Sequence, residues 1–294
     1  MSNSVENQQN SDVLKVDAFS EFSIGSLLLR MGKITPADAE RIMALHKDHG
    51  IRFGEAAKNL GLVTDADIQE VLSRQFDYPY LMPEQDTFSA ELVMAYQPFS
   101  AKAEVYRAIR SQLMLHWFGK DKKALALAAV NSGDGGSVFA ANLAVAFSQL
   151  GENTLLIDAN LRSPRQQEIF GIQEKRGLSD ILAGRANKDV IASINSFENL
   201  AVLTAGTIPP NPHELVSRSQ FRKLIADLTL DYDVVLFDAP AFTSGPDAYS
   251  IASAIGGAVI VNRKNNTKLA DTEVAAEQLA ANGSRIVGTV LVDF

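Results

Sequence analysis

The sequence contains no cysteine, which excludes a disulfide framework, a thiolate nucleophile and a cysteine-ligated metal site. It also lacks an apolar run near the roughly 18 residues that a membrane-spanning helix needs, since its densest run, 137–147, contains Ser and Asn. Residues 1–20 lack a basic start followed by an apolar block, so they do not resemble a secretory signal, and we expect a disordered polar tail there. These absences favour a cytoplasmic protein.

Basic residues are also scarce for a chain that would coat a polyanion. The sequence has 27 Lys and Arg against 35 Asp and Glu, a net charge of -8, so we expect no nucleic-acid partner. Hydrophobic residues make up 46% and charged residues 21% of the 294 residues, the balance of an ordinary globular protein. A chain of this size can bury one large core or two modest ones.

A repeat with a constant offset of 29 residues occupies the N-terminal part of the chain. Matching pairs include Gly25 and Gly54, Gly32 and Gly61, and Thr35 and Thr64. Each copy predicts a short helix ended by a glycine, followed by a threonine that caps a second, amphipathic helix. We therefore predict a helical tandem-motif domain over 21–82. Residues 83–100 have proline near both ends and no sustained period, which predicts a linker.

Residues 23–75 resemble the N-terminal domain of type II secretion and pilus ATPases, in which a tandem motif binds cyclic di-GMP. The second copy matches that motif well, and the resemblance implies a cyclic di-GMP site formed by Arg52, Gly54, Gly61 and Gln75. In the first copy the arginine and glutamine positions hold Ser23 and His46. Because arginine is the residue expected to meet a phosphate or stack on a guanine, we expect weakened binding. The alternative is a module that docks proteins.

Six short apolar runs alternate with helical patterns in the rest of the chain. They cover 124–130, 154–159, 200–205, 233–239, 257–262 and 286–292. Strands separated by helices indicate right-handed crossovers and a parallel sheet covered on both faces. The sequence therefore predicts a doubly wound α/β domain over 101–294, with ligands at the carboxyl ends of its strands.

The first of these runs is followed by the glycine-rich stretch NSGDGGS and then by a helical pattern. This order is typical of a loop that holds a phosphate on backbone N–H groups at a helix N-terminus. The predicted nucleotide-binding residues are Gly133, Asp134, Gly135, Gly136, Ser137 and Val138. Ser137 has the place from which a hydroxyl reaches Mg2+ in a phosphate loop, but Gly136 has the place of its lysine and Val130 that of its first glycine.

Acidic residues end two later strands. Asp158 ends the second apolar run and is followed by Arg162, while Asp238 lies near the end of a later run. Both acids should lie on the phosphate side of a parallel sheet. We predict Asp158 and Arg162 as catalytic residues, with Ser137 and Asp238 addressing Mg2+.

Residues 101–294 resemble the cytoplasmic domain of bacterial tyrosine kinases of polysaccharide export. The matching segments are EVYRAIR at 104–110, GLSDILAG at 177–184, PPNPHELV at 209–216 and the pair Asp247 and Ala248. The resemblance implies ATP or ADP with Mg2+ in a P-loop NTPase-like domain. It also implies a homo-oligomeric ring with Glu104, Arg107 and Arg110 at the subunit interface, a membrane chain-length determinant (a polysaccharide co-polymerase) as partner, and a peripheral place at the inner membrane.

The sequence departs from that family at several functional positions. Gly136 replaces the loop lysine, Asn160 replaces the second acid after the second strand, Val292 replaces an asparagine that often faces the adenine, and the six tyrosines form no cluster. Removing one preorganised group from such a site typically costs about 3 kcal/mol. We therefore expect a regulator of exopolysaccharide biosynthesis and chain length with a degenerate nucleotide site and weak or absent kinase activity. The alternatives are an active autokinase that borrows a cation from its neighbour, and a cyclic di-GMP-responsive adaptor.

Overall fold

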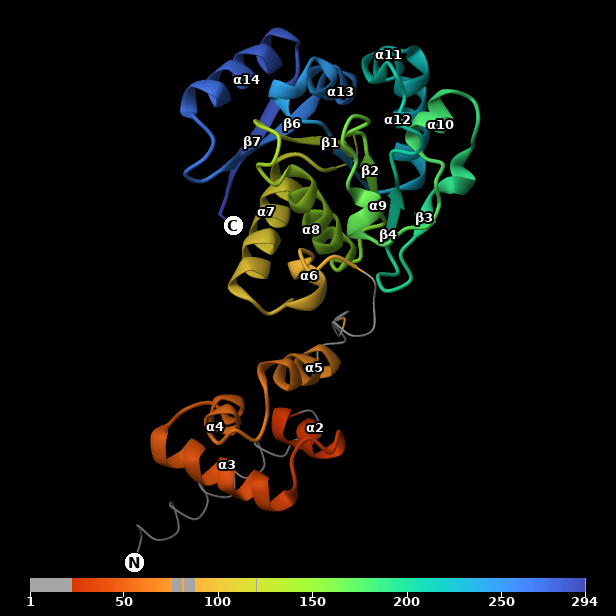
Figure 1. Cartoon of the computed structure of the whole chain (residues 1–294). Helices are drawn as coiled ribbons and strands as arrows, with labels where there is room; N and C mark the ends of the chain where they lie inside the picture. The colour runs from red at the N-terminus through yellow and green to blue at the C-terminus, as the bar shows by residue number, and fades with distance from the viewer. Residues whose placement is uncertain (1–22, 76–80, 82–87, 120, 294) are drawn as a thin grey trace, which may run out of the picture. The chain divides into compact units, whose positions relative to one another are not determined.

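The computed structural model describes residues 23–75, 81, 88–119 and 121–293, and contacts divide the chain into two units, Met1–Tyr80 and Leu81–Phe294. In the part of the chain so described, no helix combines the length and the apolar character needed to cross a membrane. The described residues of the smaller unit form four helices (Figure 1): α2 (Ile24–Arg30), α3 (Pro36–His49), α4 (Phe53–Asn59) and α5 (Asp65–Gln75).

The two copies of the repeat fold alike. The Thr35 hydroxyl accepts a hydrogen bond from the N–H of Asp38, whose carboxylate accepts one from the N–H of Thr35 in return, and the same capping box forms at Thr64. Gly32 and Gly61 end α2 and α4 with positive φ of 68° and 66°, where a side chain would be strained. The buried core of this unit draws on all four helices: Leu28, Ile34, Ala39, Ile42, Ala56, Ala57, Val63 and Val71.

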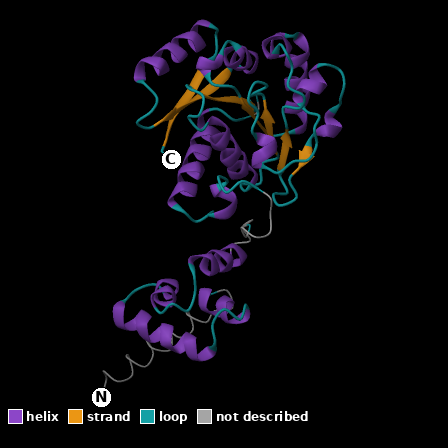
Figure 2. Ribbon diagram, in the orientation of Figure 1, coloured by secondary structure: helices purple, strands orange, loops and turns teal. Residues whose placement is uncertain are grey.

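The larger unit is built on a seven-stranded sheet in the order β3-β4-β2-β5-β1-β6-β7, shown as orange arrows in Figure 2. The strands are β1 (Ala124–Ala129), β2 (Thr154–Asp158), β3 (Ala192–Ser193), β4 (Leu200–Leu203), β5 (Val234–Asp238), β6 (Gly257–Arg263) and β7 (Arg285–Val292). Six of them are parallel, which confirms the predicted sheet. The sequence missed β3, an antiparallel edge strand, because two residues carry no readable period.

Helices cover both faces of this sheet (Figure 1). They are α6 (Val93–Tyr96), α7 (Ala101–His116), α8 (Gly136–Ser148), α9 (Gln166–Ile169), α10 (Leu178–Leu182), α11 (Pro212–Ser217), α12 (Ser219–Asp231), α13 (Asp247–Ile255) and α14 (Leu269–Ala281), with 3-10 turns at Lys188–Val190 and Phe242–Ser244. Leu125 and Leu127 of β1 pack in the cluster that contains α7 and α8, while Ala126 and Ala128 pack in the cluster of α12, α13 and α14. This alternation buries β1 on both faces, as a doubly wound sheet requires.

Part of the segment predicted as a linker lies instead in the core of the larger unit. Leu92 and Met94 are completely buried, and the N–H of Met94 donates to the side chain of the buried Asn142 on α8 at 2.9 Å. The Tyr96 hydroxyl donates to the carbonyl of Phe88. Residues 88–100 therefore differ from the prediction, because packing against α8 organises a stretch that has no period of its own.

Candidate functional site

The loop between β1 and α8 has the backbone shape that a phosphate site needs. Gly133 and Gly135 adopt φ of 85° and 83°, which only glycine takes without strain, and α8 starts directly after them. Among the described residues, the N–H groups of Gly136, Ser137 and Val138 find no acceptor. Three unpaired donors at the positive end of a 13-residue helix attract an anion.

The side chain of Asp134 belongs to the framework of this loop, and the predicted part of Asp134 in nucleotide binding stays a prediction. It is completely buried, and its carboxylate accepts hydrogen bonds from the N–H of Asn131 and from the side chains of Asn266 and Thr267, the latter two at 2.7 Å. Its own N–H donates to the carbonyl of Asn131. These contacts brace the loop against the segment after β6. Asn266 and Thr267 were missed because nothing local in their sequence links them to a loop so far away along the chain.

Gly136 is packed closely against β1. A Cβ placed on it would lie 3.2 Å from the Cβ of Ala129 and 3.3 Å from the Ala129 nitrogen, so any side chain requires a shift of the loop or the strand. A side chain at the position that lacks the lysine would thus require its neighbours to move by a few tenths of an ångström.

Asn160 is used to shape the turn after β2. Its side-chain nitrogen donates to the carbonyl of Ser163 at 2.9 Å, and its side-chain oxygen accepts from the N–H of Ser163 at 3.1 Å. Such an Asx turn satisfies the amide locally. It offers no carboxylate to a metal or to a substrate proton.

Two completely buried carboxylates, Asp158 and Asp238, end the neighbouring strands β2 and β5. The two residues lie side by side because they are in register in the sheet. Asp158 accepts hydrogen bonds from the backbone N–H groups of Asn160, Arg165 and Gln166, at 3.1, 2.9 and 2.9 Å. Burial and the neighbouring Asp238 charge raise the pKa of Asp158 well above its ordinary value, against the opposing effect of those three donors. Both predicted acids therefore lie together beside the loop.

Gln166, which the sequence analysis did not identify, ties this pair to the loop. Its Nε2 donates to Asp238 Oδ2 at 2.7 Å and to the Ser137 carbonyl at 3.0 Å, and the side chain is completely buried. Burial raises the pKa of Asp238 to about 6, although the hydrogen bonds from Gln166 and Ser137 lower it. A glutamine that begins a short helix carries no signal in sequence that would point to this site.

The oxygen atoms at this site fit the ligands that a magnesium ion needs. Among the described residues, Asp238 Oδ1 and Gln166 Oε1 are buried oxygens without a hydrogen-bond partner. Mg2+ takes oxygen ligands and is usually held by one or two carboxylates together with waters and phosphates. The orphaned oxygens, the two acids and the Ser137 hydroxyl would meet that need, even though no cluster of three or more His, Cys, Asp or Glu forms in the described residues.

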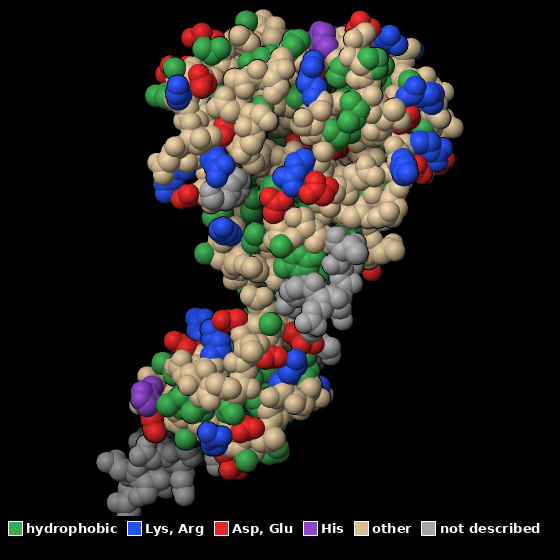
Figure 3. All heavy atoms as spheres, viewed as in Figure 1, with side chains coloured by type: hydrophobic (Ala, Val, Ile, Leu, Met, Phe, Trp, Pro, Cys, Tyr) green, Lys and Arg blue, Asp and Glu red, His purple; other side chains and the backbone are tan. Residues whose placement is uncertain are grey.

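The arginines nearest in sequence to these acids are already paired. Arg162 binds the buried Asp247 through Nε at 2.6 Å and Nη2 at 3.3 Å, and this partner raises the pKa of the guanidinium. Arg165 lies 3.0 Å from Glu91. On the face that Figure 3 shows, Lys and Arg side chains lie among Asp and Glu side chains and form no continuous basic area. The structure thus turns Arg162, a predicted catalytic residue, toward α13.

The predicted interface residues on α7 make contacts within their own chain. Arg107 pairs with Glu104 and also donates to the carbonyl of Pro98. Arg110 donates to the carbonyl of Ala146 on α8 at 2.8 Å. Their role between subunits stays a prediction.

The predicted cyclic di-GMP residues lie on α4 and α5 and at their ends. Arg52 is the N-cap residue of α4, and Gly54 is buried where a Cβ would lie 3.2 Å from Ile68. Gly61 follows α4, while Gln75 ends α5, and its buried side-chain oxygen has no hydrogen-bond partner among the described residues. Their role in binding cyclic di-GMP stays a prediction.

Comparisons with known proteins agree on one group. Residues 122–269, about half of the chain, match the model of the cellulose biosynthesis protein BcsQ family. The tyrosine-protein kinase YwqD of Bacillus subtilis is 33% identical over 195 residues, which are 66% of this chain and 82% of that protein. The chimerical protein CapA2B2 superposes with a TM-score of 0.65 and 32% identity, covering 76% of this chain and 97% of that one. The septum site-determining protein MinD of Pyrococcus horikoshii, solved with Mg-ADP, has a TM-score of 0.51 and 26% identity, over 58% of this chain and 70% of that one.

Proposed function

Because the chain belongs to the bacterial tyrosine-protein kinase family, we propose that it is a kinase-like component of exopolysaccharide synthesis whose nucleotide site is catalytically degenerate. The observation that carries the proposal is Gly136, which supplies no cation at the point where the loop would meet a terminal phosphate and which packs closely against Ala129. Phosphoryl transfer depends almost wholly on positioning and on neutralising charge. Losing one such group typically lowers the rate about 100-fold.

A second missing group deepens the defect. The Asn160 amide is hydrogen-bonded in its own turn and has no basic oxygen to offer an attacking hydroxyl. Arg162 would compensate only by leaving the buried carboxylate of Asp247, which would then remain charged without its partner. The side chains of Asn160 and Arg162 are thus both committed elsewhere.

The groups that remain in the nucleotide site support binding of ADP and ATP better than they support catalysis. The N–H groups at the start of α8 would hold phosphate oxygens, while Ser137, Asp238 and Gln166 would hold Mg2+. Bound Mg2+ neutralises phosphate charge. Asp158 keeps the segment 160–166 folded against the site through three backbone hydrogen bonds. We expect ADP and ATP to bind with reduced affinity.

We further propose that the protein works through assembly with a membrane chain-length determinant at the inner membrane and as a homo-oligomer. The outer face of α7 supports an interface, because Val105 and Leu115 are 57% and 75% exposed on the helix that carries the predicted arginines. Exposed apolar side chains beside charged ones are typical of protein-protein contacts.

The test combines calorimetric titration with Mg-ATP and mass spectrometry for phosphotyrosine on the full chain. We expect weak binding, no autophosphorylation, and little gain in a Gly136→Lys, Asn160→Asp double variant because of the contact with Ala129. Adding Ala129→Gly removes the Cβ contact, although the backbone nitrogen at 3.3 Å stays, and should partly raise ATP affinity. Robust phosphotyrosine formation by the unmodified protein would overturn the proposal. If that activity also rose with protein concentration and vanished in Arg107→Ala, it would favour the autokinase that borrows a neighbour's cation.

A further inference from the structure

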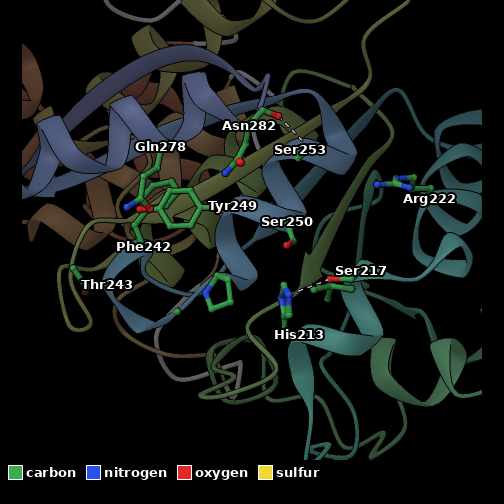
Figure 4. Close-up of a pocket in the computed structure, with 13 residues that line it drawn as sticks. His213, Ser217, Arg222, Phe242, Thr243, Tyr249, Ser250, Ser253, Gln278 and Asn282 are labelled. Atoms are coloured by element: carbon green, nitrogen blue, oxygen red, sulfur yellow. Dashed lines mark hydrogen bonds between the residues drawn. The ribbon is translucent and has the colours of Figure 1, made fainter.

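A cavity of about 630 Å³ is lined in part by the segment that follows β5. Its walls come from α11, α12, α13, the 3-10 turn Phe242–Ser244 and the end of α14 (Figure 4). None of the loop residues 131–138 lines it. Its volume lies within the roughly 300–1,000 Å³ that small-molecule sites occupy. The cavity is therefore a separate feature that the phosphate site does not explain.

The lining is suited to an anion although the whole chain is acidic. None of its thirteen residues is acidic, whereas Arg222 and His213 are among them. Arg222 is exposed and has no hydrogen bond or ion pair with any described residue, and in Figure 4 it extends from α12 toward the cavity. An unpaired guanidinium at a cavity wall is a donor group for a phosphate or a carboxylate.

His213 lies between Asp247 and Ser217, and its Nδ1 makes no hydrogen bond with the described residues. Nδ1 lies 3.4 Å from Asp247 Oδ1, and Nε2 lies 3.5 Å from the Ser217 hydroxyl (Figure 4). Asp247 is in turn fixed by Arg162. The imidazole thus lies at the wall of the cavity, with Nε2 on the side of Ser217.

The rest of the lining combines an aromatic wall with groups that bind hydroxyls. The rings of Phe242 and Tyr249 lie 5.0 Å apart between centroids, and the neighbouring lining residues Ser250, Gln278 and Asn282 bring one hydroxyl and two amides. Apolar faces beside hydroxyl and amide groups suit a ring that carries several hydroxyls.

We propose that this cavity binds a phosphorylated sugar, with the phosphate against Arg222 and His213 and the sugar ring along Phe242 and Tyr249. Neither the phosphate loop nor its catalytic state enters this proposal. A charge-assisted hydrogen bond is strong enough that removing Arg222 should weaken binding about tenfold or more.

The experiment is calorimetric titration of the full chain with glucose 1-phosphate, inorganic phosphate and phenyl phosphate. Arg222→Ala is the test variant, and Lys223→Ala is its matched control, an exposed cation at the next position of α12 that does not line the cavity. We expect glucose 1-phosphate to bind more tightly than the other two, with the loss confined to Arg222→Ala.

A second measurement, by NMR, tests whether the ligand binds next to His213 in the cavity. The chain has four histidines, so a His213→Gln variant assigns the His213 ring signal in a proton-carbon NMR spectrum, and that signal should move on titration. Three outcomes would overturn the proposal: no binding at millimolar glucose 1-phosphate, binding that survives Arg222→Ala, or tighter binding of phenyl phosphate, which would point to phosphorylated tyrosine instead.

Discussion

The substitution Asp238→Asn should stabilise the larger unit when Mg2+ is absent. Asp238 is completely buried beside Asp158, and its pKa rises from 3.8 to about 6. Because 1.36 kcal/mol corresponds to one pKa unit, the buried charge costs about 3 kcal/mol of unfolding free energy at high pH. Asparagine carries no charge, its oxygen still accepts from Gln166 Nε2, and its amide can donate to the orphaned Gln166 Oε1.

The stability gained by Asp238→Asn should depend on pH. A carboxyl group whose pKa is raised on folding costs nothing below its unfolded pKa, here 3.8, and its full amount above its folded pKa, here about 6. The advantage of Asp238→Asn should therefore be near zero at pH 4 and approach about 3 kcal/mol at pH 8.

Urea unfolding followed by fluorescence suits this measurement. Trp117 is the only tryptophan of the sequence and is 5% exposed in the core of the larger unit, so its emission reports that unit alone. In the parent, Mg2+ should raise the unfolding free energy, because an ion that binds only the folded state stabilises it, and Asp238→Asn should remove most of this effect.

Asp158→Asn is the contrasting control. Three backbone N–H groups donate to the Asp158 carboxylate, and an asparagine would set its own NH2 group against some of them. We expect this variant to be about 1–3 kcal/mol less stable than Asp238→Asn at pH 8. A destabilised Asp238→Asn at pH 8 without Mg2+, or a gain that does not change with pH, would contradict the cost assigned to the buried Asp238 charge.

Three further predictions use the same unfolding assay. Gly136→Ala should cost about 1–2 kcal/mol by overpacking, with part of it recovered by adding Ala129→Gly, and an unchanged stability would refute the close packing. Arg162→Ala strands a buried carboxylate and should cost about 1–3 kcal/mol, whereas Arg165→Ala, in an exposed pair, should cost less than about 1; equal losses would contradict this. Gly177→Ala places a Cβ 2.1 Å from a backbone oxygen and should cost about 3 kcal/mol or more, so a folded, equally stable variant would disprove that contact.

The parallel sheet could be predicted because its signal is local. Each long strand is a short apolar run bounded by helical patterns, and such runs follow from burial on both faces regardless of what they pack against. The glycine loop and the acids at Asp158 and Asp238 followed from the same pattern, since parallel strands end at one edge. Residues 88–100 could not be predicted, because Leu92 and Met94 are ordered by α8 and not by their own period.

The sequence by itself therefore determined the order of elements, the place of the phosphate loop and the absence of a lysine at Gly136. Only the tertiary structure decided how the site is completed: Gln166 joins the acids to the loop, Asp134 turns inward, and Arg162 pairs with Asp247. The physical reason is the distance along the chain between the residues that determine each feature. Periodicity and strand ends are fixed by neighbours along the chain, whereas hydrogen bonds between buried side chains depend on which distant segments meet when the sheet is assembled.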